Sequence, residues 1–273
     1  RHFQEKGIRM ALVYSLSVFS FVLAALCKES AIIFPIVIFL YALFFKSQEE
    51  IENSNRSIKF HYMSFFVIVV ALYAILRASA LNFLEEPLIK TGNNLYLSIL
   101  TGIKSIAGYV GLVFFPGKLF MERSIPQVNS IFEIPAPFFI IVGLVFIAVA
   151  TLKSNKIVSF SLWWFFINLV PVSGIFPLKA NMSEHWMYMA LMGFLIAIAF
   201  YCLRLYDTFK KLKPLLFCIL FLALFLLCTR TLNRNADWAD KMKFYENTIK
   251  FSPYSIKVLN NLGNAYFEDR KFN

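Results

Sequence analysis

The feature that most constrains this chain is a series of apolar runs that approach the roughly 20 residues an α-helix needs to cross a bilayer. Hydrophobic residues make up 59% of the 273-residue sequence, which contains 32 phenylalanines. A soluble domain of this length would leave much of that apolar surface in contact with water. The sequence therefore predicts an all-α, multi-pass membrane protein and excludes an ordinary soluble domain.

Seven of these runs are expected to cross the membrane. They are residues 10–27, 31–45, 60–79, 136–152, 157–176, 186–205 and 215–229. A further run, residues 95–115, is less apolar and is interrupted by glycines and by Lys104. We expect this run to form a helix that lies on the outer membrane surface or dips into it.

The basic residues set the orientation. The net charge of +11 is typical of a membrane protein whose cytoplasmic loops are rich in Lys and Arg, so it does not indicate nucleic-acid binding. All the short basic loops lie on the cytoplasmic side only if residues 95–115 do not cross the membrane. If this run does cross, the loop with Lys153 and Lys156 moves outside, against the charge rule.

The C-terminal residues differ from the rest in composition. Leu259, Leu262, Gly263 and Tyr266 occupy the spacing of a tetratricopeptide (TPR) repeat, and Pro253 stands where a preceding helix pair would end. The sequence thus predicts a transmembrane domain at residues 1–229 and the start of an extracytoplasmic TPR α-solenoid at residues 230–273. Because one repeat cannot bury its own apolar face, more repeats are expected beyond residue 273, and the chain is expected to be an internal segment.

The four cysteines do not form a metal-binding pattern. Each lies within an apolar run or at its end, where a small buried or lipid-facing side chain is the expected role. The sequence also lacks a nucleotide-binding loop, a zinc motif and a serine nucleophile elbow. We therefore expect no metal and no cofactor.

Ionisable residues collect at the outer ends of the predicted spans. They are Lys28, Glu29, Arg77, Glu122, Arg123, Glu184 and His185, and Tyr188 shares a helix face with Glu184. Each one alone has a structural explanation, such as headgroup anchoring by a long cation or a helix-dipole contact by a first-turn acid. Their convergence on one membrane face favours a site. Cations there would bind a lipid phosphate, and a carboxylate would orient a hydroxyl or accept its proton.

The segment FSLWWFFINLVPVSGIFPLKANMSEHWMYMALMGF resembles TPR-containing, protein O-mannosyltransferase-like membrane glycosyltransferases. The matching positions are Trp164, Leu169, Pro171, Ser173, Glu184, His185, Trp186, Tyr188, Gly193 and Phe194. ALCKESAIIFPIVIF and FFPGKLFMERSIP resemble a short turn and an acidic stretch of the same family, so the resemblance covers almost the whole chain. The sequence departs from the family pattern at His185, where an arginine is common, and at Ala190, where a proline is common.

The resemblance implies a GT-C fold and the transfer of a sugar from a polyprenyl-phosphate donor to an extracytoplasmic acceptor, often a protein Ser or Thr hydroxyl. Glu184 and His185 are the expected catalytic residues. The expected substrate-binding residues are Lys28, Glu29, Arg77, Glu122, Arg123 and Tyr188. The catalytic base is expected upstream of Arg1, so this segment alone should be inactive.

The expected partners are membrane lipid, the lipid-linked sugar donor, and an acceptor or partner protein bound through the TPR helices. The expected location is a bacterial inner membrane or a eukaryotic endoplasmic reticulum membrane. Two other functions remain open. A transporter or flippase for polyprenyl-linked substrates would need ionisable groups near the bilayer midplane, where Asn168 is the nearest candidate. A non-catalytic membrane anchor for a TPR scaffold would tolerate the loss of the outer polar residues.

Overall fold

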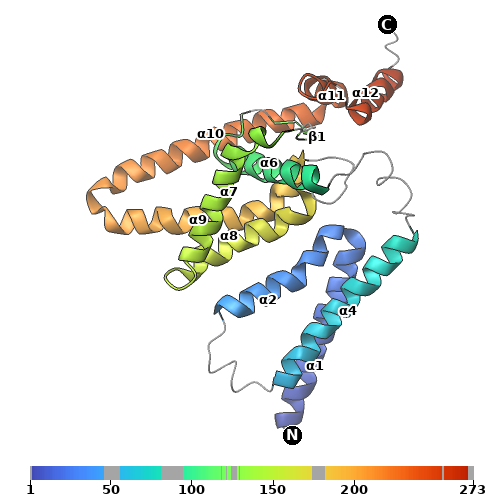
Figure 1. Cartoon of the computed structure of the whole chain (residues 1–273), viewed down its shortest axis with the longest axis vertical. Coiled ribbons are helices and arrows are strands. Elements are labelled where there is room, and N and C mark those ends of the chain that lie inside the picture. Colours follow the sequence, from blue (N-terminus) through green and yellow to red (C-terminus); the bar gives the residue numbers. More distant parts are fainter. Residues whose placement is uncertain are drawn as a thin grey trace. The chain divides into compact units, whose positions relative to one another are not determined.

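The computed structural model describes residues 2–45, 56–80, 95–117, 119–120, 122–123, 128, 130–173, 182–253 and 255–269. Within these ranges the side chains of residues 2–8, 29, 56–63, 77, 78, 80, 95 and 122 are not described. The described residues form ten α-helices and a single pair of two-residue strands, so the predicted all-α fold is confirmed (Figure 1). The chain divides into two compact units, Arg1–Gly92 and Asn93–Asn273.

The first unit is held together by aromatic side chains. It contains α1 (His2–Cys27), the 3-10 turn η1 (Glu29–Ile33), α2 (Phe34–Phe45) and α4 (Arg56–Ala80). The Phe21 ring lies 5.9 Å from the Phe34 ring and 5.3 Å from the Phe66 ring, measured between centroids. One aromatic cluster therefore connects the three helices. In a membrane the lipid is as apolar as the side chains, so helices associate through close side-chain packing of this kind.

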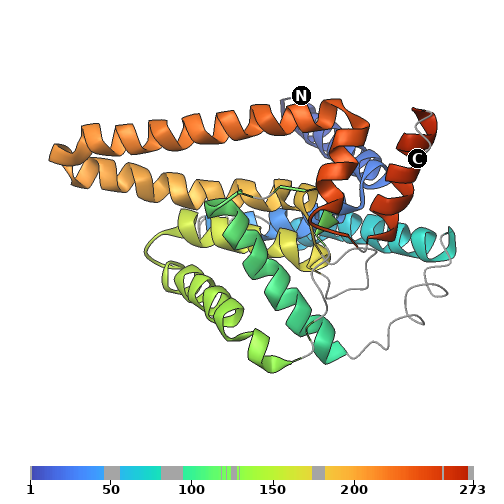
Figure 2. The ribbon, with the colours of Figure 1, turned by 90° about the horizontal axis from the view of Figure 1, so that it is seen from above.

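The second unit contains the remaining elements. These are α6 (Leu95–Phe114), β1 (Glu122–Arg123), η2 (Ile131–Glu133), α7 (Pro135–Ala150), α8 (Lys156–Leu169), η3 (Val170–Val172), β2 (Met182–Ser183), η4 (Glu184–Trp186), α9 (Met187–Thr208), η5 (Lys210–Leu212), α10 (Lys213–Ala239), α11 (Lys241–Ile249) and α12 (Ile256–Glu268). Figure 2 shows α9 and α10 as two arms joined at η5.

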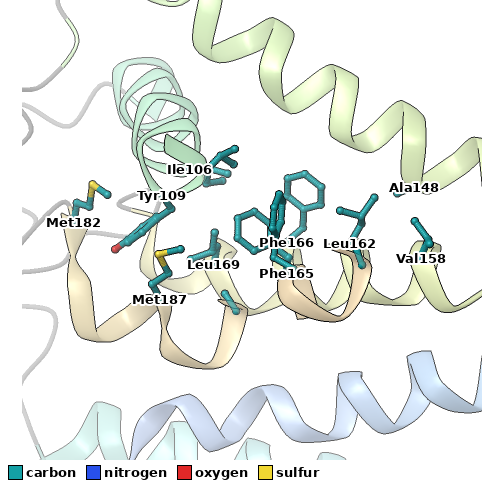
Figure 3. Close-up of a cluster of buried hydrophobic side chains, with 14 residues drawn as sticks. Ile106, Tyr109, Ala148, Val158, Leu162, Phe165, Phe166, Leu169, Met182 and Met187 are labelled. Carbon is teal, nitrogen blue, oxygen red and sulfur yellow. The ribbon is translucent and has the colours of Figure 1, made fainter. Parts of the chain in front are cut away.

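The core of this unit lies where α8 packs against α9 and α7, and α6 packs on α7 and adds side chains to the same cluster. Phe165 of α8 and Phe194 of α9 have ring centroids 4.9 Å apart, and both side chains are buried. Figure 3 shows Tyr109 of α6 beside this cluster, with its hydroxyl directed toward the segment that carries Met182 and Met187. Gly193 allows α8 and α9 to approach closely, because a Cβ there would lie 2.6 Å from the Ser161 carbonyl oxygen.

Four of the described helices are long and apolar enough to cross a membrane, which is the pattern of a multi-pass membrane protein. They are Arg9–Cys27, Tyr96–Phe114, Glu184–Thr208 and Lys210–Ala239. Three of the predicted spans, residues 10–27, 186–205 and 215–229, lie within these helices. The other four predicted spans coincide with the shorter apolar helices Ser30–Phe45, Ser64–Leu76, Pro135–Ala150 and Lys156–Val172. The total of seven spans stays a prediction.

Helix α6 lies where the sequence predicts a surface helix, within one residue of the predicted end. Lys104, in the middle of this 20-residue helix, forms a 2.6 Å ion pair with Glu133, the last residue of η2, which lies two residues ahead of α7. Tyr109, farther along α6, bonds to the backbone of Ser183, which directly precedes η4 and α9. Residues in the middle of α6 therefore contact residues that lie just ahead of two other helices, α7 and α9. Length and hydropathy alone would also permit α6 to cross, so its surface position stays a prediction that these contacts support.

Two helix ends differ from the predicted spans. The predicted span 157–176 corresponds to α8, which ends at Leu169, followed by the 3-10 turn η3. Pro171 lacks a backbone N–H and cannot continue the α-helical hydrogen bonding, so the helix tightens there. Helix α10 begins at Lys213 and continues to Ala239, past the end of the predicted span at residue 229. The predicted domain boundary at residues 229–230 therefore falls inside a continuous helix.

The C-terminal helices α11 and α12 form a packed pair. The Tyr266 hydroxyl donates a 2.8 Å hydrogen bond to Glu246, and Val258 and Phe244 are buried. Asp240 caps α11 by accepting from two of its backbone N–H groups, and Ser255 caps α12 by accepting from the N–H of Val258. The positions predicted for a TPR motif lie on α12, and the assignment of a TPR repeat stays a prediction.

Candidate functional site

Two short strands bring predicted site residues together. Strand β1 pairs antiparallel with β2, and Arg123 lies opposite Met182 while Glu122 lies opposite Ser183. Glu184 follows β2 directly, so the pairing places it beside Arg123, although 61 residues separate the two in the chain. We call residues 116–123, which connect α6 to β1 and include it, the strap; residues 118 and 121 lie outside its described part.

Glu184 is bound through both of its carboxylate oxygens. Its Oε1 atom accepts a 2.6 Å hydrogen bond from the backbone N–H of Phe120 and a 3.3 Å bond from Arg123 Nη2. Its Oε2 atom lies 3.8 Å from Arg234 Nη2 of α10. The Glu184 side chain is only 22% exposed, and charge-assisted bonds in such a partly dry environment are strong. Glu184 therefore fixes the strap and two arginines in one arrangement.

Arg230 and Arg234 extend this arrangement along α10. Arg230 donates hydrogen bonds to the carbonyl oxygens of Pro116 and Gly117 in the strap. Arg234 Nη1 lies 3.6 Å from Asp237 of the same helix, and Asp237 accepts a 3.2 Å bond from the side chain of Asn247 in α11. Polar contacts thus lead continuously from Glu184 to the C-terminal helix pair.

His185 lies beside a buried serine. The Nδ1 atom of His185 and the hydroxyl of Ser183 are 2.8 Å apart. Ser183 is itself anchored by Tyr109, whose hydroxyl donates to the Ser183 carbonyl at 3.0 Å and accepts from the Ser183 N–H at 2.9 Å. The Tyr109 side chain is fully buried, so both backbone groups are satisfied away from water. The exposed imidazole of His185 is therefore oriented by a serine whose backbone is itself held by Tyr109.

The other predicted site residues are placed as follows. Lys28 is exposed and has an extended backbone at the start of η1, in the first unit. Glu29 of η1 and Arg77 of α4 belong to the same unit, and their side chains lie outside the described residues, as does that of Glu122 in β1. Tyr188 in the first turn of α9 is 73% exposed and takes no part in the described bonds of Glu184.

Sequence reasoning missed four residues that build this region: Tyr109, Phe120, Arg230 and Arg234. A backbone N–H such as that of Phe120 leaves no signal in a sequence. Arg230, Arg234 and Asp237, in contrast, are spaced as residues of one helix face, which is a readable signal. The predicted domain boundary at residues 229–230 hides this signal, because it places the three residues in a separate domain after the last span.

The described side chains include no group of three or more His, Cys, Asp or Glu residues arranged to hold a metal ion. All four cysteines are free thiols, and no two of them are joined by a disulfide. The region around Glu184 is therefore a centre of charged and aromatic groups. Arg123 stacks on the Phe120 ring with Cζ 4.2 Å from the centroid, a geometry that orients its guanidinium.

The comparisons with known proteins add no further assignment. The chain matches no protein-family model. No curated protein and no solved structure matches it either.

Proposed function

We propose that this chain is part of a membrane glycosyltransferase that moves a sugar from a polyprenyl-phosphate donor to an extracytoplasmic acceptor, with a protein Ser or Thr hydroxyl as the preferred acceptor. The observation that carries this proposal is the convergence of Arg123, Glu184 and His185 at the start of α9, beside α10. The sequence places this end of α9 at the outer membrane surface. Such a charged, partly buried centre suits a reaction on a lipid phosphate group.

In the proposed reaction, the acceptor oxygen attacks the anomeric carbon of the sugar through an oxocarbenium-like transition state. The bond between that carbon and the phosphate oxygen breaks, and polyprenyl phosphate leaves. The acceptor hydroxyl gives its proton to a base, which the family resemblance assigns to a residue upstream of Arg1. His185 would stabilise the negative charge that grows on the leaving phosphate, and the sequence predicts the same role for Lys28 and Arg77 of the first unit.

The bonds of Glu184 suggest an orienting role within this reaction. Both of its oxygens face positive or N–H groups of the protein, so the carboxylate holds Arg123 and the strap beside His185. The sequence predicts a similar orienting role for Glu29, whose side chain lies outside the described residues. His185 would make the contact with the donor phosphate, because its imidazole is exposed and its Nδ1 atom is oriented by Ser183.

A transfer assay on the full-length parent protein tests the proposal. It uses radiolabelled polyprenyl-phosphate sugars and a peptide acceptor, and compares the wild type with Glu184→Gln and Arg77→Ala. Lys241→Ala is the matched control, because Lys241 forms an exposed ion pair with Glu268 away from Glu184. We expect transfer to be lost in the first two variants and kept in the control. Absence of transfer by the wild type with every donor would refute the proposal.

The second candidate function is a membrane anchor for a helical-repeat scaffold. One observation favours it: both carboxylate oxygens of Glu184 face arginine or N–H groups of the protein, as in a structural ion-pair centre. Under this function Glu184→Gln would loosen the C-terminal helices without affecting any sugar transfer. The transporter function has less support, because Asn168, its nearest midplane candidate, donates its amide to the Trp164 carbonyl of its own helix.

A further inference from the structure

The outer end of α10 and the C-terminal helix pair are attached to the region of Glu184 by several independent contacts. Arg230 binds two carbonyl groups of the strap, and Arg234 lies between Glu184 and Asp237. Asp237 in turn accepts from Asn247 of α11. The three residues of α10 lie on one helix face, so this face is directed at the strap and at α11 together.

A second contact reaches the same helices from the strap. The Phe120 ring stacks on the Phe251 ring, which follows α11, with centroids 5.1 Å apart and planes 16° apart. The backbone N–H of the same Phe120 is the group that binds Glu184. One residue of the strap therefore touches Glu184 through its main chain and the C-terminal helices through its side chain.

We propose that Arg234 is a positioning residue, which holds the α11–α12 pair at a fixed place beside Glu184 and His185. This proposal rests on the glycosyltransferase function proposed above, because its consequence is that an acceptor polypeptide bound to α11–α12 reaches the reactive centre in one orientation. A planar guanidinium suits this task, since its two Nη atoms lie within ion-pair distance of two carboxylates at once, 3.8 Å from Glu184 and 3.6 Å from Asp237. Its side chain is 11% exposed, so these contacts are shielded from water and salt.

The structure identifies Arg234 rather than its neighbours for a geometric reason. Arg230 binds backbone carbonyl groups of the strap, and Arg123 lies on the strap itself, where it bonds to Glu184. Arg234 pairs with Glu184 of the predicted site and with Asp237 of its own helix, and Asp237 in turn accepts a bond from Asn247 of α11. The rings of Trp238 and Phe244 flank its guanidinium at 5.8 and 5.5 Å, which restricts its rotamers.

The first test measures position and does not depend on activity. Spin labels are attached at Phe132→Cys in η2 and Asn264→Cys in α12, both exposed, in the full-length protein with its native cysteines replaced. Double electron–electron resonance in nanodiscs then reports the distance distribution between the labels. We expect a narrow distribution in the wild type and in a Lys153→Ala control, which changes an exposed residue in the turn between α7 and α8, and a clearly broadened or shifted one in Arg234→Ala.

Two variants guard against simple misfolding. Asn247→Ala removes the bond between α11 and Asp237, together with an exposed bond from Lys250 to Asn247, and should broaden the distribution while circular dichroism stays unchanged. Arg234→Lys keeps the charge but loses the fork of donors, so it should restore the narrow distribution only in part. An unchanged distribution in both Arg234→Ala and Asn247→Ala would overturn the positioning role.

The second test separates this proposal from the function on which it rests. In the transfer assay, Arg234→Ala should raise the KM for a folded acceptor protein by about tenfold or more while the KM for the polyprenyl-phosphate donor stays unchanged. A short free peptide, which does not need α11–α12, should lose less. If the wild type transfers no sugar, the glycosyltransferase function fails, and the resonance distances still decide whether Arg234 positions the helices. Equal losses for protein and peptide acceptors would overturn the role in acceptor presentation.

Discussion

Replacing Gly193 by alanine should destabilise the fold, because α8 and α9 touch at this position. A Cβ built on Gly193 lies 2.6 Å from the Ser161 carbonyl oxygen, 2.6 Å from Trp164 Cδ1 and 2.9 Å from Trp164 Cγ. The carbonyl belongs to the backbone of α8 and cannot rotate away. The Trp164 ring is also fixed, since its Nε1 atom donates a 2.8 Å bond to the Met189 carbonyl one turn earlier in α9.

The magnitude follows from three terms. Forcing one extra methyl group into a close helix contact costs about 1–3 kcal/mol. Displacing Trp164 also weakens its bond to Met189, which contributes about 0.5–1.5 kcal/mol. The higher helix propensity of alanine returns at most about 1 kcal/mol, and less where the denatured state keeps its helices. The net loss is about 2 kcal/mol, which lowers the ratio of folded to unfolded protein by a factor of about 30.

Reversible unfolding in mixed micelles, with sodium dodecyl sulfate as denaturant, measures this loss. Near-ultraviolet circular dichroism follows the packing of the aromatic side chains. Gly143→Ala in α7 is the matched control, because a Cβ there meets nothing within 4 Å, and its stability should equal or slightly exceed that of the wild type. If Gly193→Ala proves as stable as Gly143→Ala, the close contact between α8 and α9 is not a constraint and the reasoning is refuted.

Three further predictions concern other parts of the molecule. Tyr109→Phe should cost about 1–3 kcal/mol in the same unfolding assay, because it leaves the buried N–H and C=O of Ser183 without their shared partner; a loss below about 0.5 kcal/mol would show that water replaces the hydroxyl. In sealed vesicles, a membrane-impermeant maleimide should modify Phe132→Cys from outside and Ser154→Cys only after permeabilisation, and the reverse pattern would mean that α6 crosses the membrane. Asp240→Ala should destabilise α11 by about 1 kcal/mol, since the carboxylate caps its first turn; hydrogen exchange of the α11 amides measures the effect, with α9 as internal reference.

The sequence predicts helices well where a run of apolar residues must be kept from water. The predicted surface helix 95–115 agrees with α6 within one residue, because polar segments flank the run on both sides. The end of α8 is less readable, since apolar residues continue beyond Pro171 and hydropathy does not register the missing N–H. The continuation of α10 to Ala239 is hidden for the opposite reason: the polar residues after the membrane segment resemble a connecting loop although they form a solvated helix.

The candidate site was predictable in part. Arg123 and Glu184 were identified as charged residues at membrane boundaries, but their direct contact depends on two strands of two residues each. Strands this short contain no alternation, so no pattern predicts their pairing. Arg234 reaches Glu184 only because α10 remains helical for several turns beyond the apolar region, and a sequence divided at residue 229 cannot show that contact.

Because α10 is continuous, the number of residues in the last apolar segment determines the direction in which Arg230 and Arg234 point. An α-helix rotates by about 100° and rises about 1.5 Å for each residue. One extra residue ahead of Arg230 would therefore swing Arg230 and Arg234 away from the strap, although the hydropathy of the segment would hardly change. An insertion of three or four residues would return both guanidiniums to nearly their original direction and raise them by about 5 Å. The number of residues in α10 thus determines the direction in which the side chains near its C-terminal end point. Its length is therefore constrained by the helical repeat as well as by the thickness of the bilayer.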